Sequence, residues 1–376
     1  MMREIHLWVP ELDRTRGGIQ AFSHFLLLAL KAAVPRVRIR TLAKSGFGAN
    51  ADHLHMGCVP GPLRTLVYAA NLLSAGLWFQ PALVITSHAN FLPAARLLKR
   101  WRGIPYVGVA HGIEVWGNRR PRLRAALHCA DLILAVSRHT RELLTTEQQV
   151  PPERLGILPN TFDQAAFSPG PKPPELMRRY HLPTSARVIF SFGRLAASER
   201  YKGFDRIITA LPEIRRRVPD THYLIGGTGD DRPRLESLAQ ANGTAERVIF
   251  TGYIRPEELC GHYNLCDVFA MPSTGEGFGI VFLEALACGK PVMAGNRDGS
   301  VDALADGRFG ALIDPESQPT IKNTLVQMLL HHHPHPLMYE PDELRRQVTA
   351  KFGFEAFSNN LAQQLRRVLP DSAFIS

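Results

Sequence analysis

The sequence predicts an α/β protein built from two doubly wound parallel-sheet domains of similar size. Short apolar runs rich in β-branched residues alternate with segments of helical periodicity throughout the 376 residues. Such runs, separated by helices, are typical of parallel strands covered on both faces. The alternation breaks once, at the proline-rich stretch 167–174, and then restarts. We therefore expect domains at 1–165 and 166–354.

In the first domain, apolar runs predict the strands and helical periodicity predicts the segments between them. The expected strands cover residues 5–9, 37–42, 83–86, 106–109, 132–136 and 155–158, and the expected helices cover 19–33, 63–79, 91–101 and 138–146. The opening segment carries Glu4 and Pro10 where a secretory peptide needs an apolar stretch, so we interpret it as a strand.

The second domain repeats the pattern. Its expected strands cover residues 188–192, 223–225, 248–250, 268–271, 291–294 and 311–313, and its expected helices cover 204–217, 232–241, 256–263 and 279–287, followed by amphipathic helices at 341–348 and 355–368. Two such domains joined by a hinge can turn the carboxyl ends of both sheets toward a central cleft.

The net charge of +10 lies entirely in the first domain. Residues 1–165 hold 20 Lys and Arg against 10 Asp and Glu, whereas the remaining residues hold 24 of each. Such a field attracts anionic lipid or phosphorylated substrates. Nucleic acid is disfavoured, because basic and aromatic residues do not interleave and no binding module is recognisable. The densest basic clusters, at 99–102 and 119–124, fit either a solvated face or a contact patch for an anionic membrane.

Membrane spans and disulfides are not expected. No charge-free apolar run reaches the ~20 residues of a spanning helix, and the best run, 66–79, favours a buried core helix over a membrane-interface segment. The five cysteines are scattered without a C-x-x-C pair, which favours a reducing compartment. We expect a cytoplasmic protein.

The most informative motif covers residues 273–285. Three glycines within five residues follow an apolar strand and open a helix that contains Glu284. Glycines permit close backbone approach, and the helix N-terminus offers free N–H groups, so an anion or a sugar hydroxyl can bind there. Glu276 and Glu284 are too widely spaced for the close carboxylate pair of a simple glycosidase. They fit separate contacts along one extended ligand.

Two cations precede this motif by about eighty residues. Arg194 and Lys202 flank a strand-to-helix loop, where they could neutralise a diphosphate without a metal ion. Gly227 follows the next strand, at the same expected sheet edge. In the first domain, Gly17 and Gly18 precede a helix, and His111 ends a strand. Because a third glycine at dinucleotide spacing is missing, a nicotinamide dehydrogenase is disfavoured.

These residues, together with Pro159-Asn160, resemble the retaining, nucleotide-sugar-dependent glycosyltransferases of carbohydrate-enzyme family 4, also called group 1. The resemblance covers nearly the whole chain. It implies the GT-B fold, in which two Rossmann-like domains face a central cleft and helix 355–368 returns to the first domain.

The resemblance also implies a role for each matching residue. Arg194 and Lys202 would hold the donor diphosphate, and Glu276 a donor-sugar hydroxyl. Glu284 would bind the ribose, and His111 would lie near the transferred sugar. The remaining implied donor contacts are Gly17, Gly18, Gly227, Tyr253, Ile254, Gly277, Phe278 and Gly279. The chain departs from the family pattern at Gly229-Asp230, where a proline commonly follows the glycine turn, and at 299–302, where G-G-x-x-E is common.

The expected function is retaining transfer of a hexose from a nucleoside diphosphate sugar to an acceptor hydroxyl, in polysaccharide, lipopolysaccharide or glycolipid biosynthesis. The acceptor would be a glycan or lipid-linked molecule, with peripheral contact at the inner face of the cell membrane. Without a D-x-D motif, no metal and no cofactor are expected. A sugar-nucleotide epimerase or phosphorylase on the same fold and a non-catalytic sugar-nucleotide-binding protein remain alternatives.

Overall fold

A computed structural model describes the chain except for residues 1–3, 13–16, 46–52, 56–60, 118–119 and 375–376. The chain divides into two compact units, one formed by Met1–Thr161 with Phe354–Ser376 and the other by Phe162–Gly353. The break follows Thr161 rather than residue 165.

The first unit contains a parallel sheet of seven strands in the order β3-β2-β1-β4-β5-β6-β7. The strands are β1 (Ile5–Val9), β2 (Ile39–Ala43), β3 (His53–His55), β4 (Leu83–Thr86), β5 (Tyr106–Ala110), β6 (Leu132–Ala135) and β7 (Leu155–Ile157). The short strand β3 is absent from the sequence expectations, because its three residues are not an apolar run. The order reverses between β1 and β4, where ligands bind in doubly wound sheets.

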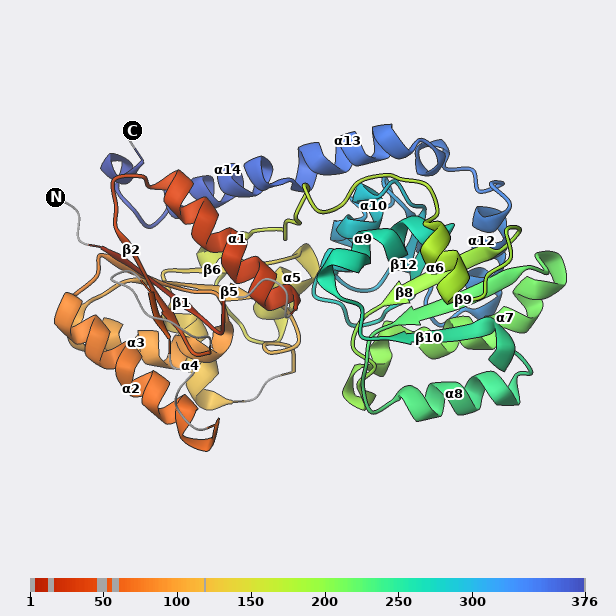
Figure 1. Ribbon diagram of the computed structural model, residues 1–376. Coiled ribbons are helices and arrows are strands. Elements are labelled where there is room, and N and C mark those ends of the chain that lie inside the picture. The colour runs from red at the N-terminus through yellow and green to blue at the C-terminus, as the bar shows by residue number, and fades with distance from the viewer. Residues whose placement is uncertain (1–3, 13–16, 46–52, 56–60, 118–119, 375–376) are drawn as a thin grey trace. The chain divides into compact units, whose positions relative to one another are not determined.

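Helices cover both faces of this sheet (Figure 1). They are α1 (Gly18–Ala33), α2 (Gly61–Phe79), α3 (Leu92–Arg102), α4 (Pro121–Cys129), α5 (Arg138–Thr146) and α14 (Phe354–Leu365). The expected buried helix 66–79 is wrong in part: in α2, Tyr68 and Leu72 are buried, but Leu66 and Trp78 are exposed. Helix α14 packs on α1 and ends before residue 368.

The second unit contains a parallel sheet of six strands in the order β10-β9-β8-β11-β12-β13. The strands are β8 (Arg187–Phe192), β9 (Thr221–Gly226), β10 (Val248–Gly252), β11 (Val268–Met271), β12 (Val292–Gly295) and β13 (Ala311–Ile313). Here the order reverses between β8 and β11. The loops after these two strands contain Arg194, Lys202 and Glu276.

The helices of the second unit form a layer on each side of its sheet (Figure 1). They are α6 (Pro174–Arg179), α7 (Phe204–Arg217), α8 (Arg232–Ala241), α9 (Pro256–Leu265), α10 (Ile280–Ala287), α11 (Ser300–Ala303), α12 (Gln318–Leu329) and α13 (Pro341–Phe352). One apolar core lies between the sheet and helices α7, α8 and α12. The proline-rich stretch packs on α9, where the Gly170 N–H donates to Asn264 Oδ1 at 3.0 Å.

Candidate functional site

The carboxyl edge of the second sheet gathers the candidate residues of that unit. Arg194 and Lys202 follow β8, Gly227 follows β9, Tyr253 and Ile254 follow β10, and Glu276 to Gly279 follow β11, while Glu284 lies in α10. His111, Gly17 and Gly18 belong to the first unit.

Lys202 lies between two carboxylates. Its Nζ is 2.5 Å from Glu276 Oε1 and 3.6 Å from Glu199 Oε2, and all three side chains are largely buried. Burial alone would lower the pKa of Lys202, but the charge of Glu276 raises it above the usual value. The lysine therefore stays cationic.

Glu199 was not among the expected site residues. It lies in the 3-10 segment Ala197–Lys202, and its second carboxylate oxygen pairs with the Arg194 guanidinium. The Arg194 side chain is 80% exposed, whereas that of Glu199 is 9% exposed. One buried carboxylate thus links both expected diphosphate-binding cations. The only sequence signal was its position three residues before Lys202.

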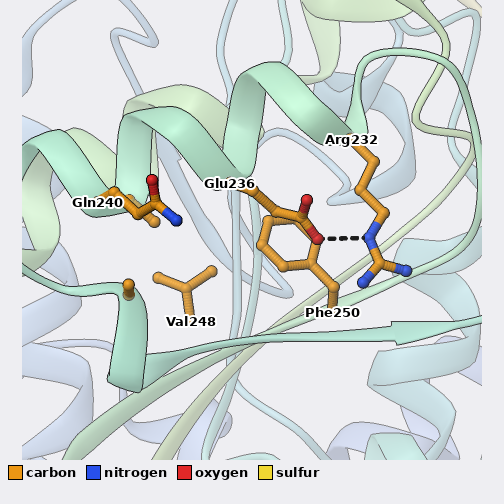
Figure 2. Close-up of a pocket in the computed structure, with 7 residues that line it drawn as sticks. Arg232, Glu236, Gln240, Val248 and Phe250 are labelled. Atoms are coloured by element: carbon orange, nitrogen blue, oxygen red, sulfur yellow. Dashed lines mark hydrogen bonds and ion pairs between the residues drawn. The ribbon is translucent and has the colours of Figure 1, made fainter.

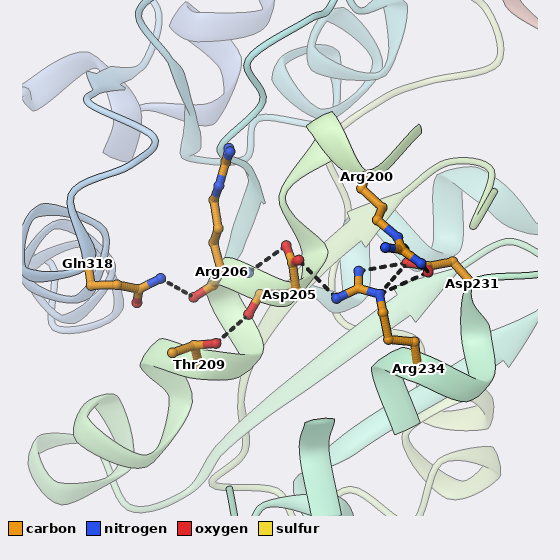
Figure 3. Close-up of polar contacts among 7 residues, drawn as sticks. All are labelled: Arg200, Asp205, Arg206, Thr209, Asp231, Arg234 and Gln318. Carbon is orange, nitrogen blue, oxygen red and sulfur yellow. Dashed lines mark hydrogen bonds and ion pairs between the residues drawn. The ribbon is translucent and has the colours of Figure 1, made fainter. Parts of the chain in front are cut away.

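The 3-10 segment that carries Glu199 and Lys202 is braced by ion pairs (Figure 3). Arg200 Nε and Arg234 Nε donate to Asp231 Oδ1 at 2.9 and 2.8 Å, and Arg234 Nη1 donates to Asp205 Oδ2 at 3.1 Å. The hydrogen bond from Arg234 is the main reason that the pKa of Asp231 is lowered, although burial opposes it. These bonds join the segment to α7 and α8.

The loop of Glu276 is fixed by the turn that follows β12. Asp298 Oδ2 accepts from Ser273 Oγ at 2.8 Å and from the Glu276 N–H at 2.7 Å. The Gly299 N–H donates to the Glu276 carbonyl at 2.8 Å, and a Cβ at Gly299 would lie 2.0 Å from the Gly277 carbonyl. The turn at 299–302, which departs from the family pattern, therefore positions Glu276.

Helix α10 begins directly after this loop. Gly279 has a φ of 88° at its N-cap, and no side chain in the described part of the chain caps this end. Its first N–H groups and the positive end of the helix dipole can therefore interact with an anion. The Phe278 side chain is buried against Phe352, with ring centroids 5.7 Å apart, so only its backbone could contact a ligand.

Glu284, on α10, has a different hydrogen-bond partner from Glu276. Its Oε2 accepts from the Tyr263 hydroxyl at 2.7 Å. Burial raises the pKa of Glu284 to about 7, and Tyr263 opposes this shift only in part. The carboxyl is therefore close to half protonated at neutral pH. Tyr263 was also absent from the sequence expectations.

Gly227 has a steric reason to be glycine. Its φ is 122°, its N–H donates to the Gly252 carbonyl at 2.9 Å, and a Cβ would lie 1.9 Å from the Gly193 carbonyl. The ends of β8, β9 and β10 therefore pack closely. Beyond Gly252, Ile254 is buried, whereas Tyr253 is exposed.

His111 occupies the carboxyl edge of the first sheet. Its Nε2 donates to the Ser87 carbonyl at 2.8 Å, which in the neutral ring leaves Nδ1 as the acceptor. The Phe22 ring packs edge-on against the imidazole, with the two ring centroids 4.8 Å apart. Burial is the main reason that the pKa of the neighbouring His88 is lowered to about 4, so that ring is neutral at pH 7. Gly17 and Gly18 are exposed at the start of α1.

Two surface cavities are lined by none of the expected site residues. In the first unit, a cavity of about 540 Å³ is lined by Asn90, Pro93, Arg120, Pro121, Arg122 and Leu123. In the second, a cavity of about 320 Å³ lies between α8 and β10, where Arg232 pairs with Glu236 at 2.7 Å (Figure 2).

Within the described residues, no three His, Cys, Asp or Glu side chains are grouped to hold a metal ion. Nor does any helix in the described ranges have the length and apolarity needed to cross a membrane.

Family models match both halves of the chain. Residues 16–165 match Glycosyltransferase Family 4, and residues 174–340 match Glycosyl transferases group 1. The GDP-mannose-dependent alpha-(1-6)-phosphatidylinositol monomannoside mannosyltransferase of Mycobacterium tuberculosis is 33% identical over 325 residues, which are 82% of this chain and 80% of that protein. Its Mycolicibacterium smegmatis counterpart is 38% identical over 59% of this chain and 60% of its own length.

Solved structures share the fold. Sucrose-phosphate synthase from Thermosynechococcus elongatus superposes with a TM-score of 0.77 at 19% identity, over 97% of this chain and 99% of that one. Anabaena HepE in complex with UDP gives a TM-score of 0.75 at 20% identity, over 97% and 100% of the two chains. The chain therefore belongs to the group 1 glycosyltransferases and has their GT-B fold.

Proposed function

We propose that this glycosyltransferase moves a hexose from a nucleoside diphosphate sugar to an acceptor hydroxyl, with retention at the anomeric carbon. The observation that carries the proposal is the cluster of Arg194, Glu199, Lys202 and Glu276 at the β8–β11 switch point, beside the N-terminus of α10. This is the edge at which doubly wound sheets bind nucleotides.

The cluster suits a departing diphosphate. Negative charge grows on the leaving group as the glycosidic bond breaks, and fixed cations and N–H groups that bind this charge lower the barrier. The Lys202 ammonium is paired with Glu276. In the proposed reaction, Glu276 turns to a sugar hydroxyl while Lys202 and Arg194 take the diphosphate, so no divalent ion is required.

Retention is proposed to follow same-face attack by the acceptor. Glu276, which the resemblance implies to contact a hydroxyl of the donor sugar, is assigned to that hydroxyl and not to covalent attack on the anomeric carbon. The leaving phosphate would instead accept the acceptor's proton. His111, whose Nδ1 is left as an acceptor, would orient the transferred sugar.

The names of the relatives support one donor and one acceptor class. Two of them are named as GDP-mannose-dependent and others as D-inositol 3-phosphate glycosyltransferases. We propose GDP-mannose as the donor and a phosphorylated or lipid-linked acceptor in glycolipid or polysaccharide assembly. Arg120 and Arg122 line the apolar cavity of the first unit, where such an acceptor would find both charge and apolar surface.

Incubation of the purified chain with GDP-mannose, UDP-glucose and a panel of inositol and glycolipid acceptors tests the proposal. We expect an α-linked product from an α-linked donor by NMR, with turnover unchanged by EDTA. A β-linked product would contradict retention, and loss of turnover in EDTA would contradict metal independence. An altered sugar nucleotide without acceptor would identify an epimerase, and binding without turnover a non-catalytic protein.

A further inference from the structure

Two cysteine thiols outside the donor cluster are in contact. The Sγ of Cys260, on α9, lies 3.8 Å from the Sγ of Cys288, which directly follows α10. The two residues are far apart in sequence, and neither has a role in the proposed transfer.

The two thiols have different surroundings. Cys260 is half-buried, and its Sγ accepts a hydrogen bond from Asn264 Nδ2 at 3.5 Å. Its hydrogen bond with Cys288 lowers the pKa of Cys260 to about 6, against the effect of burial. Cys288 is buried, and the same contact together with burial raises its pKa. A half-buried thiol with a lowered pKa therefore lies in contact with a buried thiol, as in redox-sensing cysteine pairs.

We propose that Cys260 and Cys288 form a reversible intramolecular disulfide when the chain meets hydrogen peroxide. The Cys260 thiolate attacks one peroxide oxygen, the O–O bond breaks, and the leaving hydroxide takes a proton to become water. Cys288 then attacks the sulfur of the resulting sulfenic acid and releases a second water. Two electrons pass from the sulfurs to the peroxide, and a dithiol reverses the reaction.

The disulfide would join the helices that hold Glu284. Tyr263 of α9 donates to Glu284 of α10, and the Cys288 N–H donates to the Glu284 carbonyl at 3.1 Å. The sulfurs would approach from 3.8 Å to about 2.05 Å, and the new bond would tie the end of α10 to α9 and restrain the position of Glu284. If Glu284 binds the donor ribose, as the proposed function holds, oxidation weakens nucleotide binding.

Mass spectrometry of the purified full chain tests the modification. After reduction, removal of reductant and hydrogen peroxide treatment, we expect a loss of about 2 Da, for two hydrogen atoms, and a peptide linking residues 260 and 288. Dithiothreitol should reverse both. Cys288→Ser should instead gain about 16 or 32 Da at Cys260. Cys129→Ser, in which a cysteine of the first unit is replaced, is the control and should form the same crosslink as the wild type. A linkage through Cys58, Cys129 or Cys266, or oxygen addition alone, overturns the proposal.

Calorimetry with GDP and UDP tests the regulatory part. We expect the crosslinked chain to bind nucleoside diphosphate at least about threefold more weakly than the reduced chain, and Cys260→Ser to be insensitive to peroxide. Equal affinities in a fully crosslinked sample overturn regulation of the donor site. If the reduced chain binds neither nucleotide, it is the proposed transfer reaction that fails, while the mass result still decides the disulfide.

Discussion

Lys202 Nζ lies 2.5 Å from Glu276 Oε1, so the residues expected to bind the diphosphate and the sugar of the donor form an ion pair with each other. Under the proposed function, a sugar nucleotide would replace this ion pair with two contacts, one from a hydroxyl to Glu276 and one from the diphosphate to Lys202. The charge of Glu276 keeps the buried lysine cationic.

Lys202→Gln should lower kcat by a factor of about 100–1000, because the variant loses the cation that stabilises the leaving diphosphate. Steady-state kinetics with saturating donor measure this effect. Lys322→Gln is the matched control, because it also removes a lysine that is paired with a glutamate: Lys322 Nζ, on α12, lies 3.8 Å from Glu213 Oε2. This variant should retain wild-type kcat. Equal losses in the two variants would refute the role of Lys202.

Glu199→Gln should lower kcat/KM about tenfold, which corresponds to about 1.4 kcal/mol. Glutamine keeps the volume of Glu199 but removes the charge that orients Arg194 and Lys202. Glu246→Gln, at an exposed ion pair with Arg215, is the control. A double-mutant cycle with Arg194→Gln should show coupling, whereas additive effects would indicate that Glu199 only supports the fold.

Gly299→Ala should reduce kcat clearly, while its effect on the free energy of unfolding should be smaller. Its φ is ordinary, but the added Cβ would lie 2.0 Å from the Gly277 carbonyl and push the Glu276 loop away from Lys202. Gly261→Ala, on α9, is the matched control, because its added Cβ would lie at an ordinary contact distance of 3.4 Å from Leu176 Cδ1. We expect this control to keep full activity, and an equally active Gly299→Ala would show that the loop tolerates the shift.

The stability of the second unit should depend on pH through Glu284. Its folded pKa of about 7 is above the usual value of 4.5, so the folded state binds more protons between these values. The contribution of Glu284 to the free energy of unfolding is fully present below pH 4.5 and is lost as pH rises through 7. Between pH 4.5 and 8, the free energy of unfolding of Glu284→Gln should therefore increase by about 1–3 kcal/mol relative to that of the wild type. Thermal unfolding measures this difference. A constant difference between the two would contradict the raised pKa.

The positions of most strands along the chain and of the loops that follow them were predictable, because apolar runs and glycine turns are local features of the sequence. The motif at 273–285 therefore led to Glu276. The partners of these residues were not predictable, since Glu199, Tyr263 and Asp298 reach them only after strands and helices pack. Helix α4 was missed because its basic residues obscure the apolar stripe of Leu123 and Leu127.

The exposed faces of α2 and α3 should bind anionic membranes. Leu66 and Trp78 of α2 are 71% and 83% exposed, Trp101 of α3 is 53% exposed, and neither helix contains an acidic residue, whereas α3 carries four basic ones. Exposed apolar side chains among cations suit an interface that offers both hydrocarbon and phosphate.

Cosedimentation with vesicles should increase with anionic lipid and decrease with salt. Trp78→Ala should weaken it severalfold, while Tyr253→Ala, an exposed aromatic of the second unit, should leave it unchanged. Binding that ignores lipid charge, or that Trp78→Ala leaves intact, would exclude this face as the contact.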